Sequence, residues 1–238
     1  MYLISQFKRS KWLLSCAAFV VMGLCGSVFA QGQSVEPRLS TIGGNVSILD
    51  SEGNSLTDRS NVVVFIDGLP AMQQDVPENG PHLMSHQDRV FSPKVLPILR
   101  GEALDFYNDD DIFHNVFSLS NTNKFDLGIY PAGTSKLVTF STSGLVKIYC
   151  NIHPDMVSTI LVLNNTLFTK TDAEGYFEIQ NVPEGALTLR VWHEFSDDFQ
   201  RTIRIGPSEQ ERFSIELIET KRRVVHKNKF GMPYRKKY

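Results

Sequence analysis

The chain has 238 residues, 42% of them hydrophobic, and carries 24 Lys and Arg against 26 Asp and Glu. After residue 30 no segment is apolar enough to span a bilayer, which excludes a membrane-embedded function for that part of the chain. If the first 30 residues are removed, 21 basic residues remain against 26 acidic ones, and the net charge becomes −5.

The first 30 residues have the pattern of a secretory signal peptide. Lys8, Arg9 and Lys11 precede an apolar stretch from Trp12 to Val28, and Val28-Phe29-Ala30 fits a cleavage site. An uncleaved membrane anchor is the alternative, but the apolar run is short and diluted for a span of about 20 residues. We therefore expect cleavage, a periplasmic location and no stable membrane insertion of the mature protein. Export also argues against a nucleic acid as partner.

After the signal, residues 31–40 are polar and are expected to be disordered. From residue 41 on, short apolar runs alternate with Gly, Asn, Asp and Pro about every 8 to 12 residues, which is typical of all-β sandwiches. The expected strands are Gly44–Leu49, Val62–Asp67, Lys94–Leu99, Ala103–Tyr107, Asn115–Ser120, Lys136–Thr139, Leu145–Cys150, Ser158–Leu163, Leu167–Thr171, Tyr176–Ile179, Leu187–His193 and Arg212–Leu217.

Cysteine usage points to a metal. Cys16 and Cys25 lie in the signal, so the mature chain keeps only Cys150. In an oxidising compartment thiols are normally paired, and a single thiol is either buried and inert or already bound to something. A metal would protect such a thiolate from oxidation and exchange.

The run Cys150-Asn151-Ile152-His153-Pro154-Asp155-Met156 has the ligand types of a blue-copper site, with His114 lying 36 residues before the cysteine. Such sites use two imidazoles and a thiolate in a plane, with a weak axial thioether. The predicted ligands of one Cu(I)/Cu(II) ion are therefore His114, Cys150, His153 and, as the axial ligand, Met156. Alternation in the preceding strand predicts that Val146, Ile148 and Cys150 share one face and Lys147 the other.

Residues from about 84 to 163 resemble the cupredoxins, most closely those of the amicyanin and pseudoazurin type. The matching stretches are Phe91-Ser92-Pro93-Lys94-Val95-Leu96, Arg100-Gly101-Glu102, Tyr107-Asn108-Asp109, His114-Asn115-Val116 and the Cys-x2-His-x2-Met loop. The resemblance implies a Greek-key sandwich in which Asn115 ties the two ligand loops together and His153 is the exit for electrons. A single cysteine in the loop implies a mononuclear site rather than a dinuclear one.

Other candidate residues carry weaker signals. A second copper site could be sought in His82, Met84 and His86, with Met72. Their spacing fits no tight ligand set, and Pro77, Gly80 and Pro81 indicate a loop. Asp109, Asp110 and Asp111 would either steer a basic partner or simply face solvent. His193 is expected to be structural.

Two further segments run from Gly44-Asn45-Val46 to Val62-Val63-Val64-Phe65 and from Thr169-Lys170-Thr171 to Leu189-Arg190-Val191. They resemble the halves of a carboxypeptidase-regulatory-like domain, which is a small prealbumin-like sandwich. Residues 41–69 match its first half and residues 165–219 its second, so we expect a cupredoxin domain, residues 70–164, inserted between them. The alternative makes Val62–Asp67 the first cupredoxin strand. Residues 220–238 form a basic tail with eight Lys and Arg, either a solvated terminus or a contact for an acidic partner or a membrane surface.

This arrangement resembles exported proteins labelled as methylamine-utilisation proteins. We expect a one-electron carrier between unidentified redox proteins, and not an enzyme. The alternative is a copper-binding module for storage, delivery or sensing without redox turnover.

Overall fold

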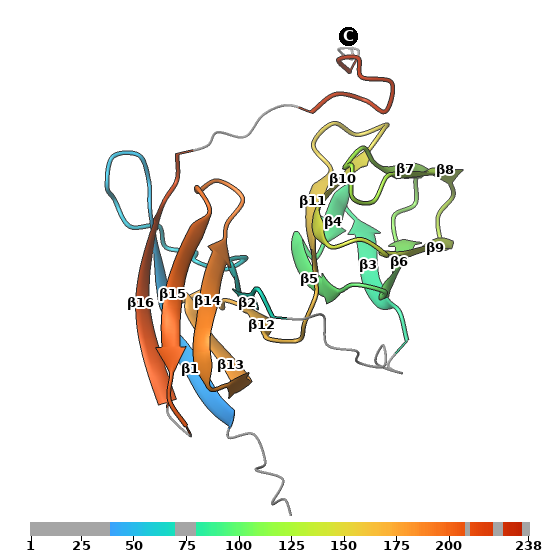
Figure 1. Ribbon diagram of the computed structural model, residues 1–238. Helices are drawn as coiled ribbons and strands as arrows, with labels where there is room; N and C mark the ends of the chain where they lie inside the picture. Colours follow the sequence, from blue (N-terminus) through green and yellow to red (C-terminus); the bar gives the residue numbers. More distant parts are fainter. Residues whose placement is uncertain (1–38, 70–79, 208–209, 221–225, 235–238) are drawn as a thin grey trace, which may run out of the picture. The chain divides into compact units, whose positions relative to one another are not determined.

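The computed structural model describes residues 39–69, 80–207, 210–220 and 226–234, and the regular structure in these residues is β-strand (Figure 1). The expected all-β class is therefore confirmed. The expected signal, residues 1–30, lies outside the described residues. Among the described residues no helix is long and apolar enough to cross a membrane.

Two sheets are built from the beginning and the end of the described chain, and we call this pair the split sandwich. Their strand orders are β13-β1-β16 and β12-β2-β14-β15. The strands are β1 (Leu39–Leu49), β2 (Val63–Asp67), β12 (Phe168–Lys170), β13 (Tyr176–Pro183), β14 (Gly185–Trp192), β15 (Phe199–Ile205) and β16 (Gln210–Ile218).

The stretch of chain between β2 and β12 forms two other sheets, which we call the central sandwich. Their orders are β5-β11-β10-β7-β8 and β4-β3-β6-β9. The strands are β3 (His82–Gln87), β4 (Val90–Ser92), β5 (Val95–Leu99), β6 (Ala103–Asn108), β7 (His114–Ser118), β8 (Phe125–Tyr130), β9 (Ser135–Thr139), β10 (Gly144–Cys150) and β11 (Val157–Leu163).

Strand pairing shows where the two early strands belong. β1 runs antiparallel to β13 and parallel to β16, with Val46 opposite Ile215. β2 runs antiparallel to both β12 and β14. The expected strands Gly44–Leu49 and Val62–Asp67 therefore both pair with strands that come after residue 165, and β2 is an inner strand of a split-sandwich sheet.

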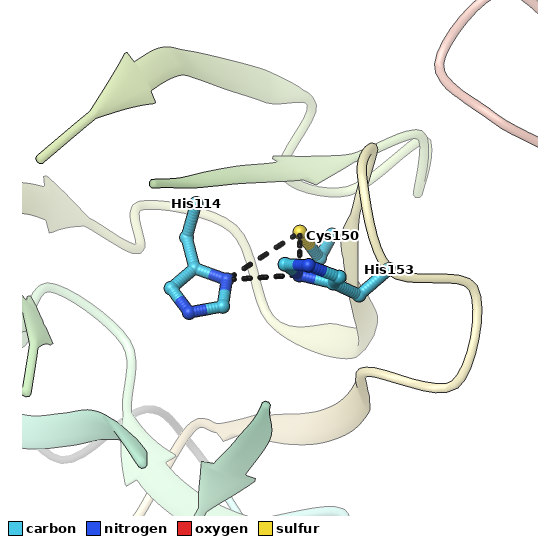
Figure 2. Close-up of side chains that lie close together, drawn as sticks. All are labelled: His114, Cys150 and His153. Atoms are coloured by element: carbon cyan, nitrogen blue, oxygen red, sulfur yellow. Dashed lines mark hydrogen bonds between the residues drawn. The ribbon is translucent and has the colours of Figure 1, made fainter. Parts of the chain in front are cut away.

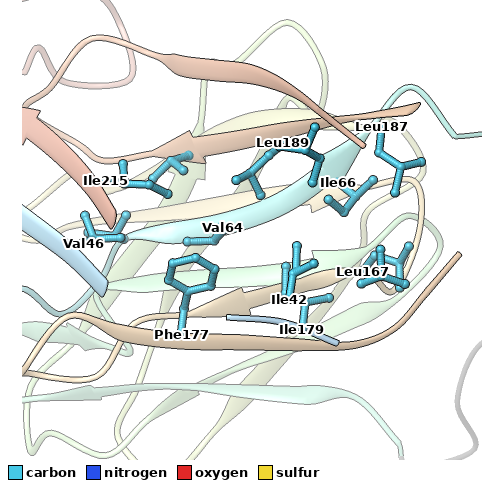
Figure 3. Close-up of a cluster of buried hydrophobic side chains, with 14 of the residues drawn as sticks. Ile42, Val46, Val64, Ile66, Leu167, Phe177, Ile179, Leu187, Leu189 and Ile215 are labelled. Carbon is cyan, nitrogen blue, oxygen red and sulfur yellow. The ribbon is translucent and has the colours of Figure 1, made fainter. Parts of the chain in front are cut away.

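The split sandwich has its own hydrophobic core, drawn in Figure 3. Ile42, Val64, Phe177 and Leu189 are at most 1% exposed and come from both of its sheets. Burying side chains of this size contributes about 1.5–3 kcal/mol each. The turn before β13 supports this core, because Gly175 has φ +84° and its backbone comes so close to Val46 that a Cβ would lie 2.1 Å from that carbonyl oxygen.

The central sandwich surrounds a separate core, which includes Phe106, Phe140 and Ile160. β7 lies between β10 and β8, and each of its five residues is buried. In β10 the predicted alternation is confirmed: Val146, Ile148 and Cys150 are fully buried, and Lys147 on the other face is not.

Some local expectations are wrong. Leu39 and Ser40 belong to β1, although residues 31–40 were expected to be disordered; residues 31–38 lie outside the described residues. The expected loop around His82 and His86 is the strand β3, which pairs in parallel with β6. The short strand β4 and the longer strands β8 and β15 were also not expected. The side chains of β3 do alternate between buried and less buried positions, since Met84 and His86 are buried. Because one of these inward positions is a polar histidine, the sequence lacks the apolar alternation by which a strand is predicted.

Candidate metal centre

Three of the four predicted ligands meet at one end of the central sandwich. His114 is the first residue of β7, Cys150 is the last residue of β10, and His153 follows in the loop before β11. Because β7 and β10 are antiparallel neighbours, with Cys150 opposite Val116, the start of one strand lies beside the end of the other. Figure 2 shows the three side chains directed toward one another.

The distances between the donor atoms fit a metal ion. Cys150 Sγ lies 3.8 Å from His114 Nδ1 and 3.7 Å from His153 Nδ1, and the two nitrogens are 3.2 Å apart. An ion with bonds of about 2.0 Å to nitrogen and about 2.3 Å to sulfur in a trigonal plane would separate nitrogen and sulfur by about 3.7 Å, and the two nitrogens by about 3.5 Å. The donor set is therefore spaced as a trigonal site with two nitrogen ligands and one sulfur ligand requires.

The site lies at the edge of an apolar core. His114 and Cys150 are fully buried, and Cys150 belongs to the hydrophobic cluster of the central sandwich. His153 is half-buried. Two donors are thus shielded from water, while the third reaches toward the surface.

The surroundings of Cys150 favour its thiolate form. Burial by itself would raise the pKa of the thiol, but hydrogen bonds from His114 and from the backbone N–H groups of Asn115, Ile152 and His153 lower that pKa. The Ile152 N–H lies 3.4 Å from Sγ. Since the thiolate is the form that binds metals, the sulfur is prepared for coordination.

A carboxylate that was not predicted as part of the site orients His114. Asp110 Oδ2 lies 2.7 Å from His114 Nε2, and the Asp110 side chain is only 11% exposed. The same carboxylate accepts hydrogen bonds from the backbone N–H groups of Asp88, at 2.6 Å, and Arg89, at 3.0 Å. Because this carboxylate can keep a proton on Nε2, Nδ1 is the atom that can give up its own proton and bind a metal, which is how outer carboxylates fix metal-binding imidazoles.

Backbone hydrogen bonds close the loop from Cys150 to Met156. The Cys150 N–H donates to the Met156 carbonyl, and the Met156 N–H donates to the His153 carbonyl, each at 3.2 Å. Met156 is 1% exposed and lies in the same hydrophobic cluster as Cys150. The fourth predicted ligand is therefore placed at the buried side of the loop.

Asn115 joins the two ligand segments, as the cupredoxin resemblance implied, and it does so with its backbone. Its carbonyl accepts a hydrogen bond of 3.3 Å from the Asn151 N–H. Its side-chain amide donates instead to Asp126 Oδ1, at 2.7 Å, and to the Gly128 carbonyl, at 2.8 Å, both in β8. Asn115 thus anchors the start of β7 to β8 and to the cysteine loop together.

The residues of the rejected second copper site in β3 have other partners. His82 Nε2 is 3.0 Å from Glu102, and Met84 is buried in the core. His86 packs edge-on against His114, with ring centroids 5.5 Å apart, and lies 3.3 Å from the Tyr130 hydroxyl. Burial, aided by the neighbouring charge of His114, lowers the pKa of His86 to about 3, so this ring is neutral. Met72 lies outside the described residues.

The remaining candidates differ in their surroundings. Asp109 and Asp111, unlike Asp110, are exposed. Phe113 and Ile152, which flank the ligands in sequence, are 59% and 39% exposed. His193 Nδ1 lies 3.1 Å from the Ser196 hydroxyl and its Nε2 4.0 Å from Glu219, contacts that fit the expected structural role.

Several solved structures resemble this chain. A Cu-containing nitrite reductase from Thermus scotoductus SA-01 is 25% identical, with a TM-score of 0.35, over 42% of this chain and 28% of the reductase. A purple cupredoxin from Nitrosopumilus maritimus is 24% identical, with a TM-score of 0.31, over 34% of this chain and 99% of its own. A reduced mutant of amicyanin is 16% identical, with a TM-score of 0.34, over 42% of this chain and 98% of its own.

The resemblance is to cupredoxins. It covers less than half of this chain, and the match spans less than a third of the nitrite reductase. No protein-family model matches the chain, and no curated protein matches its sequence.

Proposed function

We propose that the central sandwich binds one copper ion through His114, Cys150 and His153, with Met156 as axial ligand, and works as a one-electron carrier in the periplasm. The observation that carries this proposal is the convergence of one thiolate sulfur and two imidazole Nδ1 atoms at the spacing of a trigonal site. Soft sulfur ligands suit Cu(I) and imidazole suits both oxidation states, so bound copper would supply a one-electron couple.

The protein's own part is to keep the donors in place. Asp110 fixes the orientation of His114, Asn115 holds β7 to the cysteine loop, and backbone bonds close that loop. A donor set that is already assembled before the metal binds needs little rearrangement when the charge on the metal changes. This rigidity supports electron transfer rather than metal delivery, since a delivery protein must release its ion.

The surface beside His153 supports contact with a redox partner. His153 is the half-buried donor, and the exposed apolar side chains of Ile152 and Phe113 are close to the ligands in sequence. We propose that electrons leave through His153 to a partner protein that covers this apolar edge. Four protein donors would leave no open position for a substrate, which supports a carrier rather than an enzyme.

The test is to add Cu(II) to the purified mature protein and record its visible spectrum. An intense thiolate-to-copper band is expected, and Cys150→Ser should abolish it. Met156→Leu should keep the band but shift it, whereas Met84→Leu, a matched change of a core methionine, should leave it unchanged. A protein that stays colourless with Cu(II) would refute the copper site.

Voltammetry then separates the carrier from the alternative of storage, delivery or sensing. A reversible one-electron wave, with copper retained through repeated cycles, is the result expected of a carrier. Loss of copper on each reduction would contradict the carrier and would favour a protein that hands its metal on.

A further inference from the structure

The part of the basic tail from His226 to Tyr234 has a defined conformation of its own. Asn228 organises it: its side-chain oxygen accepts the N–H groups of Phe230 and Met232, each at 3.0 Å. Its backbone carbonyl accepts the N–H of Gly231, which has φ +76°, at 2.8 Å. This is an Asx-type turn, and it explains why asparagine and glycine stand at these two positions.

This turn contacts the loop that carries Cys150. The Tyr234 hydroxyl donates to the Cys150 carbonyl at 2.6 Å, a short hydrogen bond that reaches the backbone of the thiolate ligand itself. The Lys229 N–H donates to the Asn151 side-chain oxygen at 2.9 Å. Next to them the His226 ring stacks on Tyr149, with centroids 4.2 Å apart and planes at 30°.

A fourth contact extends toward the segment that carries His114. Lys229 Nζ forms an ion pair of 2.6 Å with Asp126 Oδ2. The other oxygen of Asp126 accepts the Asn115 side-chain amide at 2.7 Å. The tail therefore contacts the Cys150 loop directly, and it contacts Asn115, the residue next to His114, through the carboxylate of Asp126.

We propose that residues 226–234 form a strap that positions the copper-binding loop, with Tyr234 as the positioning residue for Cys150. This inference rests on the proposed function, because it gives the strap a role only if the loop binds copper. It also assigns a role to a basic tail for which the sequence indicated only a solvated terminus or a contact with an acidic partner or a membrane.

The physical reason is that the strap adds a restraint on the Cys150 carbonyl to those that the loop's own backbone bonds provide. Its backbone bonds run to Met156, His153 and Asn115, and the Cys150 carbonyl is held by Tyr234. Without the Tyr234 hydroxyl, water would donate the hydrogen bond to this carbonyl, and the loop would sample more conformations. Outer hydrogen bonds of this kind change metal affinity even when they touch no metal.

The experiment compares full-length mature protein with Tyr234→Phe, which removes one oxygen atom. Copper loss to a chelator should become about fivefold faster, the effect of losing one hydrogen bond of ordinary strength. The visible band should remain, because the ligands are unchanged. Lys229→Gln should act in the same direction. Tyr176→Phe is the matched control, since its hydroxyl bonds Glu178 in the split sandwich, and it should not change the rate.

A second readout needs no copper. In the metal-free protein, Tyr234→Phe should shift the amide NMR signals of residues 150–153 and speed hydrogen exchange at the Lys229 N–H, while Tyr176→Phe should leave both unchanged. If the wild-type protein turns blue but Tyr234→Phe alters neither the copper release rate nor these signals, the strap is refuted and the copper site stands. If the wild-type protein stays colourless, the copper proposal fails, and the metal-free NMR comparison alone decides whether the strap holds the loop.

Discussion

At the scale of single residues, Asp110 has a position unlike those of the carboxylates on either side of it. It is nearly buried, it accepts two backbone N–H groups, and it holds Nε2 of a predicted ligand. Desolvation opposes its ionised form, but the hydrogen bonds from Arg89, His114 and Asp88 lower its pKa. A negative charge is thus kept one imidazole ring away from the proposed metal, where it would favour Cu(II) over Cu(I).

Replacing Asp110 by Asn should therefore raise the reduction potential of the copper site. A charged hydrogen bond contributes about 1.5–3 kcal/mol, and part of that remains with the amide, so an increase of roughly 50–100 mV is expected. Voltammetry of the copper-loaded protein measures it. Asp111→Asn removes an exposed charge from the next position and should change the potential much less. Equal shifts in the two variants would show that Asp110 acts only as a nearby charge.

The candidate site shows how far single residues can be predicted. The spacing of Cys150, His153 and Met156 identifies the loop because one short segment supplies several donors, and the predicted strand face places the sulfur inward. Nothing in a run of three aspartates indicates which one turns inward. That choice depends on the hairpin between β3 and β4, whose Asp88 and Arg89 have positive φ and present their N–H groups to Asp110.

At the scale of elements, a strand could be predicted from the sequence where every second residue is apolar and no polar residue takes one of these inward positions. β10 and β14 follow this pattern, with Val146, Ile148, Leu187 and Leu189 facing inward. β15 does not, since in Phe199–Ile205 only Ile203 and Ile205 are buried and the rest is polar or partly exposed. As an edge strand of its sheet it needs only a few inward residues, so its sequence carries a weak signal.

An ion pair between neighbouring strands gives the split sandwich a pH dependence. Arg190 Nη1 in β14 lies 2.9 Å from Asp67 Oδ2 at the end of β2. The hydrogen bond from Arg190 lowers the pKa of Asp67 below its usual value of 3.8. Because the folded state holds the proton less tightly than the unfolded state, Asp67 stabilises the fold above about pH 5, and this contribution is lost as the pH falls through its folded pKa.

Asp67→Asn should accordingly lower the free energy of unfolding of the split sandwich at pH 7 by about 0.5–1 kcal/mol, since both side chains are partly exposed. The difference from wild type should shrink as the pH falls below 3.8 and through the lowered pKa of Asp67. Urea unfolding followed by the NMR signals of β14 amides measures it. Arg190→Gln should reproduce the same loss of pH dependence, and a difference that stays constant from pH 7 to pH 3 would contradict the ionic origin.

At the scale of the whole molecule, the two hydrophobic cores share no residue. The split-sandwich core draws on β1 and β2 from one side of the chain and on β13 to β16 from the other, and the central core draws on the strands between them. We propose that these are two domains, the central one inserted in a loop of the split one, since an insertion at a loop costs little when the ends of the inserted domain are close together.

Copper should then stabilise one domain and not the other. A ligand present at about 100 times its dissociation constant adds about 2.7 kcal/mol to the domain that binds it, which raises the melting temperature of a domain of this size by at least about 10 °C. We expect two calorimetric transitions, of which only one moves when copper is added.

Phe177→Ala removes a core ring of the split sandwich, at a cost of about 3–5 kcal/mol, and should lower the other transition while the copper-dependent one keeps its position. Met84→Leu, a mild change in the central core, should affect only the copper-dependent transition. A single transition that responds both to copper and to Phe177→Ala would contradict this prediction. It would mean that the two sandwiches unfold as one unit, because the chain segments that join them would then couple the unfolding of one core to that of the other.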